Sequence, residues 1–196
     1  MGHMDQYTLH ANELKNLFHS IDAAVLQMCS QYADEVHCKK GCSDCCNAVF
    51  DVSYIEALTI YDTFRTLGRK DRRAVTNMAR KAVIAWERLV ERRADLSMAR
   101  IRCPLLTETG ECACYAVRPV NCRTYGLPTV IAGKAHVCGL SGFIKGVTYT
   151  TVNLNSIQEK LLTLSMGLGG LELGRQRWPI AAVLLQDSSK NRPFVR

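Results

Sequence analysis

Cysteine is the residue type that most constrains how this 196-residue chain folds, because ten cysteines are present. The first group is Cys38-x3-Cys42-x2-Cys45-Cys46, and the second comprises Cys103, Cys112, Cys114, Cys122 and Cys138. The start, Met1-Gly2-His3-Met4, is typical of an expression scar, and no secretory signal follows it. We therefore expect a cytoplasmic protein with reduced thiols, and clustered cysteines in that compartment indicate a metal rather than disulfides.

The first group has a spacing that suits a thiolate metal site. Thiolates converge on a tetrahedral ion at about 2.3 Å, and a tight turn such as Cys42-x2-Cys45 lets both side chains point inward. The adjacent pair Cys45–Cys46 is unusual, because neighbouring side chains diverge and one ion rarely takes both. Two neighbouring metals, or one cluster of several iron atoms, accommodate such a pair. The second group is too distant for a simple zinc finger, so we expect it to fold back onto the first.

Three longer motifs surround these cysteines. They are Gly41-Cys42-Ser43-Asp44-Cys45-Cys46, then Cys103-Pro104-Leu105-Leu106, and the stretch from Gly110-Glu111-Cys112 through Arg118-Pro119 to Cys122-Arg123-Thr124-Tyr125. Together they resemble the bacterial CxxCxxCC family of zinc- or iron-chelating domain proteins, over about residues 38–140. The chain departs from the family pattern in the three-residue gap after Cys38, and in Cys114, which replaces an ordinary apolar residue.

The resemblance implies metal chelation by eight thiols. The implied ligands are Cys38, Cys42, Cys45, Cys46, Cys103, Cys112, Cys122 and Cys138. Eight thiolates suit two four-thiolate centres or one multinuclear centre, and both zinc and an iron–sulfur cluster fit such donors. Cys29 and Cys114 are left over, and we interpret both as packing residues.

Two arginines flank the last of these motifs. Arg118 and Arg123 are predicted either to donate hydrogen bonds to ligand sulfurs, which would hold those sulfurs in place, or to form salt bridges with Glu108 or Glu111. The sequence leaves these two interpretations open.

Apolar residues repeat at three- and four-residue steps along three stretches, which predicts helices over residues 14–32, 53–67 and 71–95. Ser53 and Glu56 form a capping-box signature at the start of the second helix. We expect these three helices to form one layer of the core, with the irregular segment 97–140 packed on it.

Shorter elements are predicted around and beyond the irregular segment. They are a hairpin of residues 129–131 and 134–137, a weak strand at 147–154, a helix from a Ser156–Glu159 capping box to about residue 166, a flexible glycine connection at 167–174, and a short helix from Pro179 to Leu185.

The predicted fold class is therefore mainly α. We expect a helical domain with a cysteine-rich, metal-clamped irregular segment and at most a small β-hairpin. This single metal-binding domain would span residues 5–187, with the cysteine cluster at 38–138 and a polar tail at 188–196. No run of about 18 apolar residues is present, so we expect no membrane span.

Positive charge is concentrated in residues 65–102, which hold 12 Lys and Arg against 4 Asp and Glu, whereas the whole chain has a net charge of +7. A basic helix surface can meet an acidic protein partner, although a solvated surface is the simpler interpretation. Trp86 is the single aromatic residue within this stretch, which gives no series of rings for base stacking, and no nucleic-acid-binding motif is present, so we do not expect a nucleic-acid partner.

The leading functional hypothesis is a thiolate metal-binding protein with a redox or metal-handling role, whose partners are metal ions. The first alternative is an adaptor with structural zinc that binds a protein partner through the basic helices. A cysteine signature related to the family accompanies flagellin lysine methylation, so the second alternative is a component of a methyl-transfer system. The chain has no glycine-rich cofactor loop and no clear acid–base pair, which favours a protein that is not an enzyme.

Overall fold

The computed structural model describes residues 3–39, 41–96 and 98–186. Its α-helices are α1 (His3–Gln31), α2 (Tyr54–Thr66), α3 (Arg69–Glu91), α4 (Val120–Thr124), α5 (Leu154–Gly174) and α6 (Ile180–Leu184), with two 3₁₀ turns, η1 (Asp44–Cys46) and η2 (Tyr115–Val117). The predicted mainly α class is confirmed. Within these ranges, no helix combines the length and apolarity needed to cross a bilayer. The predicted polar tail 188–196 lies outside the described residues.

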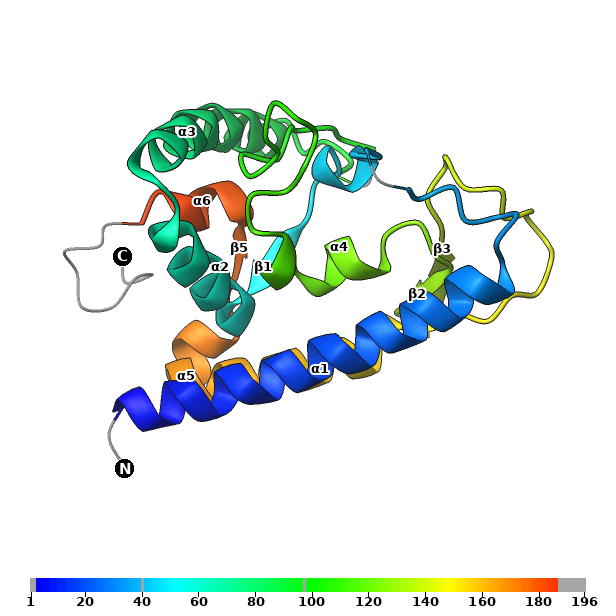
Figure 1. Ribbon diagram of the computed structural model, residues 1–196, viewed down its shortest axis with the longest axis horizontal. Helices are drawn as coiled ribbons and strands as arrows, with labels where there is room; N and C mark the ends of the chain where they lie inside the picture. The colour runs from blue at the N-terminus through cyan, green and yellow to red at the C-terminus, as the bar shows by residue number, and fades with distance from the viewer. Residues whose placement is uncertain (1–2, 40, 97, 187–196) are drawn as a thin grey trace.

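The long helix α1 forms one edge of the molecule, and α5 runs alongside it (Figure 1). The predicted apolar stripe of α1 is confirmed, because Leu14, Phe18 and Ile21 are buried. They pack with Leu161 of α5 and with residues of α2 and α4 in one apolar cluster. This cluster anchors α4, the short helix that carries Cys122.

A second apolar cluster joins α2, α3 and α6, with α3 on the opposite edge of the molecule from α1 (Figure 1). The predicted capping box of α2 is confirmed, since Ser53 and Glu56 exchange both of its hydrogen bonds. Leu105 and Cys114 of the irregular segment are buried in this same cluster. The expected single layer of three helices is wrong, because α1 belongs to a different cluster from α3 and its principal partner is α5.

The C-terminal third of the chain is more helical than predicted. Asn153, rather than Ser156, caps α5 by accepting hydrogen bonds from the amides of residues 155 and 156. The glycines of residues 167–174 are helical except Gly170, whose non-helical backbone kinks α5 and divides it into two helical segments. Gly174 serves close packing, because a Cβ there would come within 2.6 Å of the Met166 backbone. The predicted flexible connection is therefore wrong.

Two small sheets complete the fold. The predicted hairpin is present as β2 (Thr129–Ile131) and β3 (Lys134–His136), and β4 (Val152–Asn153) adds to it in parallel. A second sheet pairs β1 (Asp51–Ser53) antiparallel with β5 (Arg177–Pro179), with Val52 opposite Trp178. The strand β4 lies within the weak strand predicted at 147–154, whereas β1 and β5, which carry no strand pattern of their own, pair across more than a hundred residues and add a sheet that was not expected.

Candidate metal centre

Six thiols line one cavity of about 60 Å³ between α3, α6 and the irregular segment. They are Cys45, Cys46, Cys103, Cys112, Cys114 and Cys122. The rest of the lining is largely apolar, with Trp86 of α3, Phe50 and Ile101 among its walls. Arg102 and Arg118 are the only charged residues among those that line the cavity. The cavity is thus a sulfur-rich pocket of low dielectric constant.

Backbone hydrogen bonds bring the two cysteine groups to this cavity. The Cys103 amide donates to the Cys46 carbonyl at 2.6 Å, and the Ile101 amide donates to the Asn47 carbonyl at 3.0 Å. A further β-bridge joins Leu106 to Cys112. The expected return of the second group onto the first is therefore seen for the cysteines that line the cavity.

Cys122 enters from α4, whose position depends on a buried carboxylate. Glu56 is 2% exposed, accepts hydrogen bonds from the amide and hydroxyl of Ser53, and also accepts one from the Val120 amide at 2.8 Å. One side chain thus caps α2 and ties the first turn of α4 to it. Sequence reasoning identified the cap but not this second role.

Burial dominates the electrostatics of the cavity thiols. Desolvation, followed by the charges of neighbouring thiolates, raises the pKa of Cys122 well above its usual value. Desolvation likewise raises the pKa of Cys103 to about 12. The pKa of Cys112 is also raised by burial, and the positive charge of Arg118 opposes that rise. Without metal these thiols are therefore protonated at neutral pH, because burial disfavours the thiolate form.

The adjacent pair Cys45–Cys46 behaves as a unit. A hydrogen bond from the Cys46 thiol lowers the pKa of Cys45, and the same bond raises the pKa of Cys46. One sulfur of the pair is thereby favoured as the thiolate, which is the form that binds metal.

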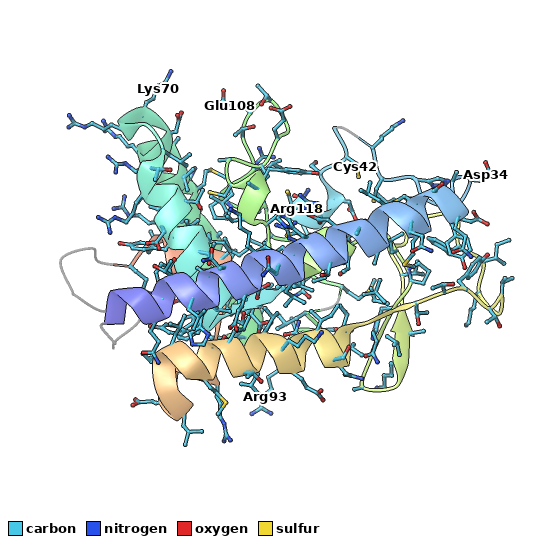
Figure 2. The ribbon with its side chains drawn as sticks, turned by 60° about the horizontal axis from the view of Figure 1, so that its bottom comes forward. Asp34, Cys42, Lys70, Arg93, Glu108 and Arg118 are labelled. Carbon is cyan, nitrogen blue, oxygen red and sulfur yellow. The ribbon has the colours of Figure 1, made fainter. Side chains whose placement is uncertain are left out.

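The other three predicted ligands lie outside the cavity, in a second group that is more exposed. Cys38 and Cys42 are exposed, and Cys138 is partly buried. Desolvation, then the charges of Cys42 and Cys138, raises the pKa of Cys38 to about 11. In Figure 2, Cys42 lies on the side of the C-terminal half of α1, and Asp34 follows the end of that helix. We call Cys38, Cys42 and Cys138 the outer thiols and the six that line the cavity the inner thiols.

Asp44 lies between the outer thiols and the rest of the protein. Its carboxylate accepts hydrogen bonds from the Tyr125 hydroxyl at 2.6 Å and from the Cys138 thiol at 3.5 Å, and it pairs with Arg100 at 3.3 Å. The Tyr125 hydrogen bond is the main reason that the pKa of Asp44 is lowered. Asp44 was part of the sequence motif but was not singled out as a functional residue.

The donor chemistry of the cavity fits a thiophilic ion. Cysteine thiolates are the preferred ligands of structural zinc and of iron–sulfur clusters. As they stand, no three Cys, His, Asp or Glu side chains of the described residues converge closely enough to hold a metal ion. A cysteine side chain reorients by rotation about χ1, which is the movement that would bring sulfurs lining one cavity onto an ion.

Arg118 and Arg123 converge on Asp22 of α1. Arg118 pairs with Asp22 at 3.2 Å, and Arg123 binds its other carboxylate oxygen. The buried Arg123 also donates to the Ala116 and Arg118 carbonyls at 2.7 and 2.8 Å. Figure 2 shows Arg118 over the middle of α1. These contacts brace the loop before Cys122 against α1, whereas the predicted hydrogen bonds to ligand sulfurs stay a prediction.

The two cysteines that sequence reasoning left over have different positions. Cys114 is 2% exposed, as a packing residue should be, yet it lines the cavity with the five predicted inner ligands. Cys29 is half-buried on α1, outside the cavity. The spacing Cys112-x-Cys114 was the available signal for the sixth inner thiol.

A family model named CxxCxxCC and described as a putative zinc- or iron-chelating domain matches residues 37–139, more than half of the chain. The matched range contains both cysteine groups. No curated protein and no solved structure matches the chain.

Proposed function

The chain belongs to the CxxCxxCC family of zinc- or iron-chelating domains and is a metal-binding protein, and on this premise we propose that the inner thiols form its principal metal centre, with a redox or metal-handling role. Cys45, Cys46, Cys103, Cys112 and Cys122 are the predicted ligands of this centre. The observation that carries the proposal is that these five thiols, from two distant parts of the chain, line one cavity.

The outer thiols are proposed as a second, more accessible centre. Cys38, Cys42 and Cys138 supply three sulfurs, and the Asp44 carboxylate beside Cys138 is a fourth donor of a type that zinc accepts. An exposed site beside a buried one suits a protein that takes up or passes on ions. Arg118 is proposed to stabilise the inner thiolates by its positive charge, and Arg123 to hold the loop that presents Cys122.

The identity of the metal decides between the redox and the handling roles. Zinc has no redox chemistry, whereas iron–sulfur clusters carry electrons. The adjacent cysteines and the absence of paired CxxC motifs in the sequence favour the iron–sulfur version. We propose to purify the protein without oxygen and to measure iron, zinc and acid-labile sulfide together with the visible spectrum. Iron with equivalent sulfide supports the redox role; zinc without sulfide contradicts it; protein without any metal contradicts the whole proposal.

Ligand variants test the location of the centre. Cys103→Ala and Cys122→Ala should lose bound metal, whereas Cys29→Ala, which removes a half-buried thiol outside the cavity, should retain it. Equal metal content in all three variants would place the metal elsewhere.

A second candidate function is a protein adaptor, and the surface of α3 favours it. Arg72, Arg73 and Arg80 are exposed, and no Lys or Arg of α3 forms an ion pair within the described ranges. Lys70 projects from the N-terminal end of α3 (Figure 2). Changing Arg72, Arg73 and Arg80 to Glu should abolish binding of an acidic protein while metal content is unchanged. Retained binding would exclude the adaptor role.

A further inference from the structure

Cys114 is the inner thiol that neither the family pattern nor the predicted ligand set includes. It precedes the turn η2, and its side chain is buried at the cavity with the five predicted ligands. Its neighbour in sequence, Ala113, is fixed by an amide hydrogen bond to the Leu105 carbonyl at 2.8 Å. The same strand-like pairing that holds Cys112 therefore also fixes the position of Cys114.

The number of thiolates at the cavity determines how many four-coordinate ions they can bind. Zinc and similar divalent cations take four ligands in thiolate sites, so two ions need eight metal–sulfur bonds. Six thiolates supply eight bonds when four bind one ion each and two bridge both ions. Five thiolates supply only seven under the same scheme. We propose that Cys114 is the sixth ligand of a two-ion centre in which two thiolates bridge a pair of thiophilic divalent cations.

The size of the cavity agrees with more than one ion. A space of about 10–15 Å³ holds a single water molecule, and this cavity has a volume of about 60 Å³. Room for two small ions is therefore available before any of the apolar wall residues moves.

The charges at the cavity agree as well. Six thiolates with two divalent cations leave a net charge of −2, and a buried charge requires compensation. Arg102 and Arg118 line the cavity, and together they carry +2. Arg118 is shared with Asp22, whereas Arg102 donates to the carbonyls of Leu106 and Thr107 and forms no ion pair within residues 3–39, 41–96 and 98–186. The positive charge of Arg102, an exposed residue that lines the cavity, is thus not taken up by a carboxylate of these residues and can offset the excess negative charge.

This inference rests on the proposed function. The number of metal ions bound per chain distinguishes failure of the sixth ligand from failure of the proposed function itself. The reduced full-length protein is loaded with Zn²⁺ and, in parallel, with Co²⁺, and ions per chain are counted by elemental analysis and native mass spectrometry. Cys114→Ala should bind one ion fewer than the unmodified chain, whereas Cys29→Ala should bind the same number. Metal-free unmodified protein would contradict the proposed function, whereas equal ion counts in the Cys114→Ala and unmodified proteins would overturn only the sixth ligand.

Magnetic coupling provides a second readout. Two Co²⁺ ions that share thiolate bridges are magnetically coupled. In protein that carries Cys38→Ala and Cys42→Ala, which remove the proposed outer centre, the paramagnetic resonance signal per cobalt should therefore be weak, and it should recover when Cys114→Ala is added. An uncoupled signal in both proteins would overturn the bridged pair. Cys114→Val fills the same site with an apolar side chain and therefore controls for a folding defect in Cys114→Ala. Circular dichroism measures whether this variant is folded. It should also bind one ion fewer than the unmodified protein.

Discussion

The carboxylate of Glu56 on α2 accepts a hydrogen bond from the backbone amide of Val120 at 2.8 Å, which fixes α4 to the core of the protein. Both residues are buried, at 2% and 0% exposure. Two residues after Val120 comes Cys122, so the position of this inner thiol is set by a carboxylate 66 positions earlier in the sequence. The proposed metal centre therefore depends on an interaction that involves none of its proposed ligands.

Replacing Glu56 should disturb both stability and metal binding. In Glu56→Ala, the Ser53 amide and the Val120 amide lose their acceptor inside the protein. Each buried donor left without a partner costs about 1–3 kcal/mol, so we expect unfolding free energy to fall by about 3–5 kcal/mol. Chemical denaturation measures this loss, and metal titration should show weaker binding because Cys122 is no longer held.

The matched control is Glu172→Ala, which removes an exposed carboxylate on α5. A surface change of this kind should alter stability by no more than about 0.5 kcal/mol. Similar losses in the two variants would show that the Glu56 hydrogen bonds are unimportant.

The carboxylate of Asp22, which pairs with both Arg118 and Arg123, should contribute more to the free energy of unfolding than an ordinary surface ion pair does. Its side chain is 33% exposed, but the Arg123 side chain that it binds is only 2% exposed. Asp22→Asn leaves that buried guanidinium without a counter-charge, and we expect a loss of about 1–3 kcal/mol of unfolding free energy. Glu13→Gln, which weakens a contact with His10 on the same helix, is the control and should cost about 0.5 kcal/mol or less. A loss in Glu13→Gln as large as that in Asp22→Asn would contradict this ranking.

Removing the metal should loosen the irregular segment before the helices. Residues 98–119 have few of the regularly spaced backbone hydrogen bonds that hold a helix or a sheet together. The helices α1 and α5, by contrast, are packed along much of their length in a separate apolar cluster. Binding at structural thiolate sites contributes on the order of 10–16 kcal/mol, which exceeds typical domain stability of about 5–15 kcal/mol. Hydrogen exchange after chelation should therefore accelerate in the irregular segment and change little in α1. Uniform acceleration, or none, would argue against a metal that holds this segment.

Metal affinity should rise with pH. Burial raises the pKa of Cys103 to about 12 and also raises that of Cys112, so both thiols must lose protons when they bind an ion. Because protons compete with the metal, the apparent affinity should increase as the pH rises over roughly pH 6–8, and proton release should accompany binding. Competition titrations with a chelator at several pH values measure the trend. An affinity independent of pH would show that the ligands were already ionised.

Local patterns in the sequence predicted local structure well. The stripe of α1, the Ser53–Glu56 capping box and the hairpin around Gly133 each depend on residues close together in the chain, and each is confirmed. The family motif likewise identified the metal-binding function. One local error concerns the glycines of α5: Gly174 permits a close contact with Met166, and only Gly170 interrupts the helix, so the stretch is packed helix with a kink and not a flexible connection.

Long-range relationships in the site could not be predicted in the same way. Nothing near Asp22 in the sequence indicates that it meets Arg118 and Arg123, because the three residues approach only when α1 packs on α4. The division of the cysteines into inner and outer thiols also follows from packing, since Cys45 and Cys42 are three residues apart but only Cys45 lines the cavity. The motif gives no sign of this difference between Cys42 and Cys45, which arises only from their burial in the fold.

Gly126 tests the outer thiols without changing any sulfur. Its φ is +94°, and a Cβ placed there would collide with the Sγ atom of Cys38. Gly126→Ala should therefore displace Cys38 and reduce metal binding at the outer thiols, in addition to the cost of about 1–2 kcal/mol for a left-handed alanine.

Gly133→Ala separates these two effects, because Gly133 has a similar φ of +72° but no heavy atom within 4 Å of the added Cβ. This control should lose comparable backbone stability while it keeps its full complement of metal. Elemental analysis and thermal unfolding of the two variants make the comparison. The outer thiols would lose their proposed role if Gly126→Ala bound as much metal as Gly133→Ala, because displacement of Cys38 would then be without consequence for the ion.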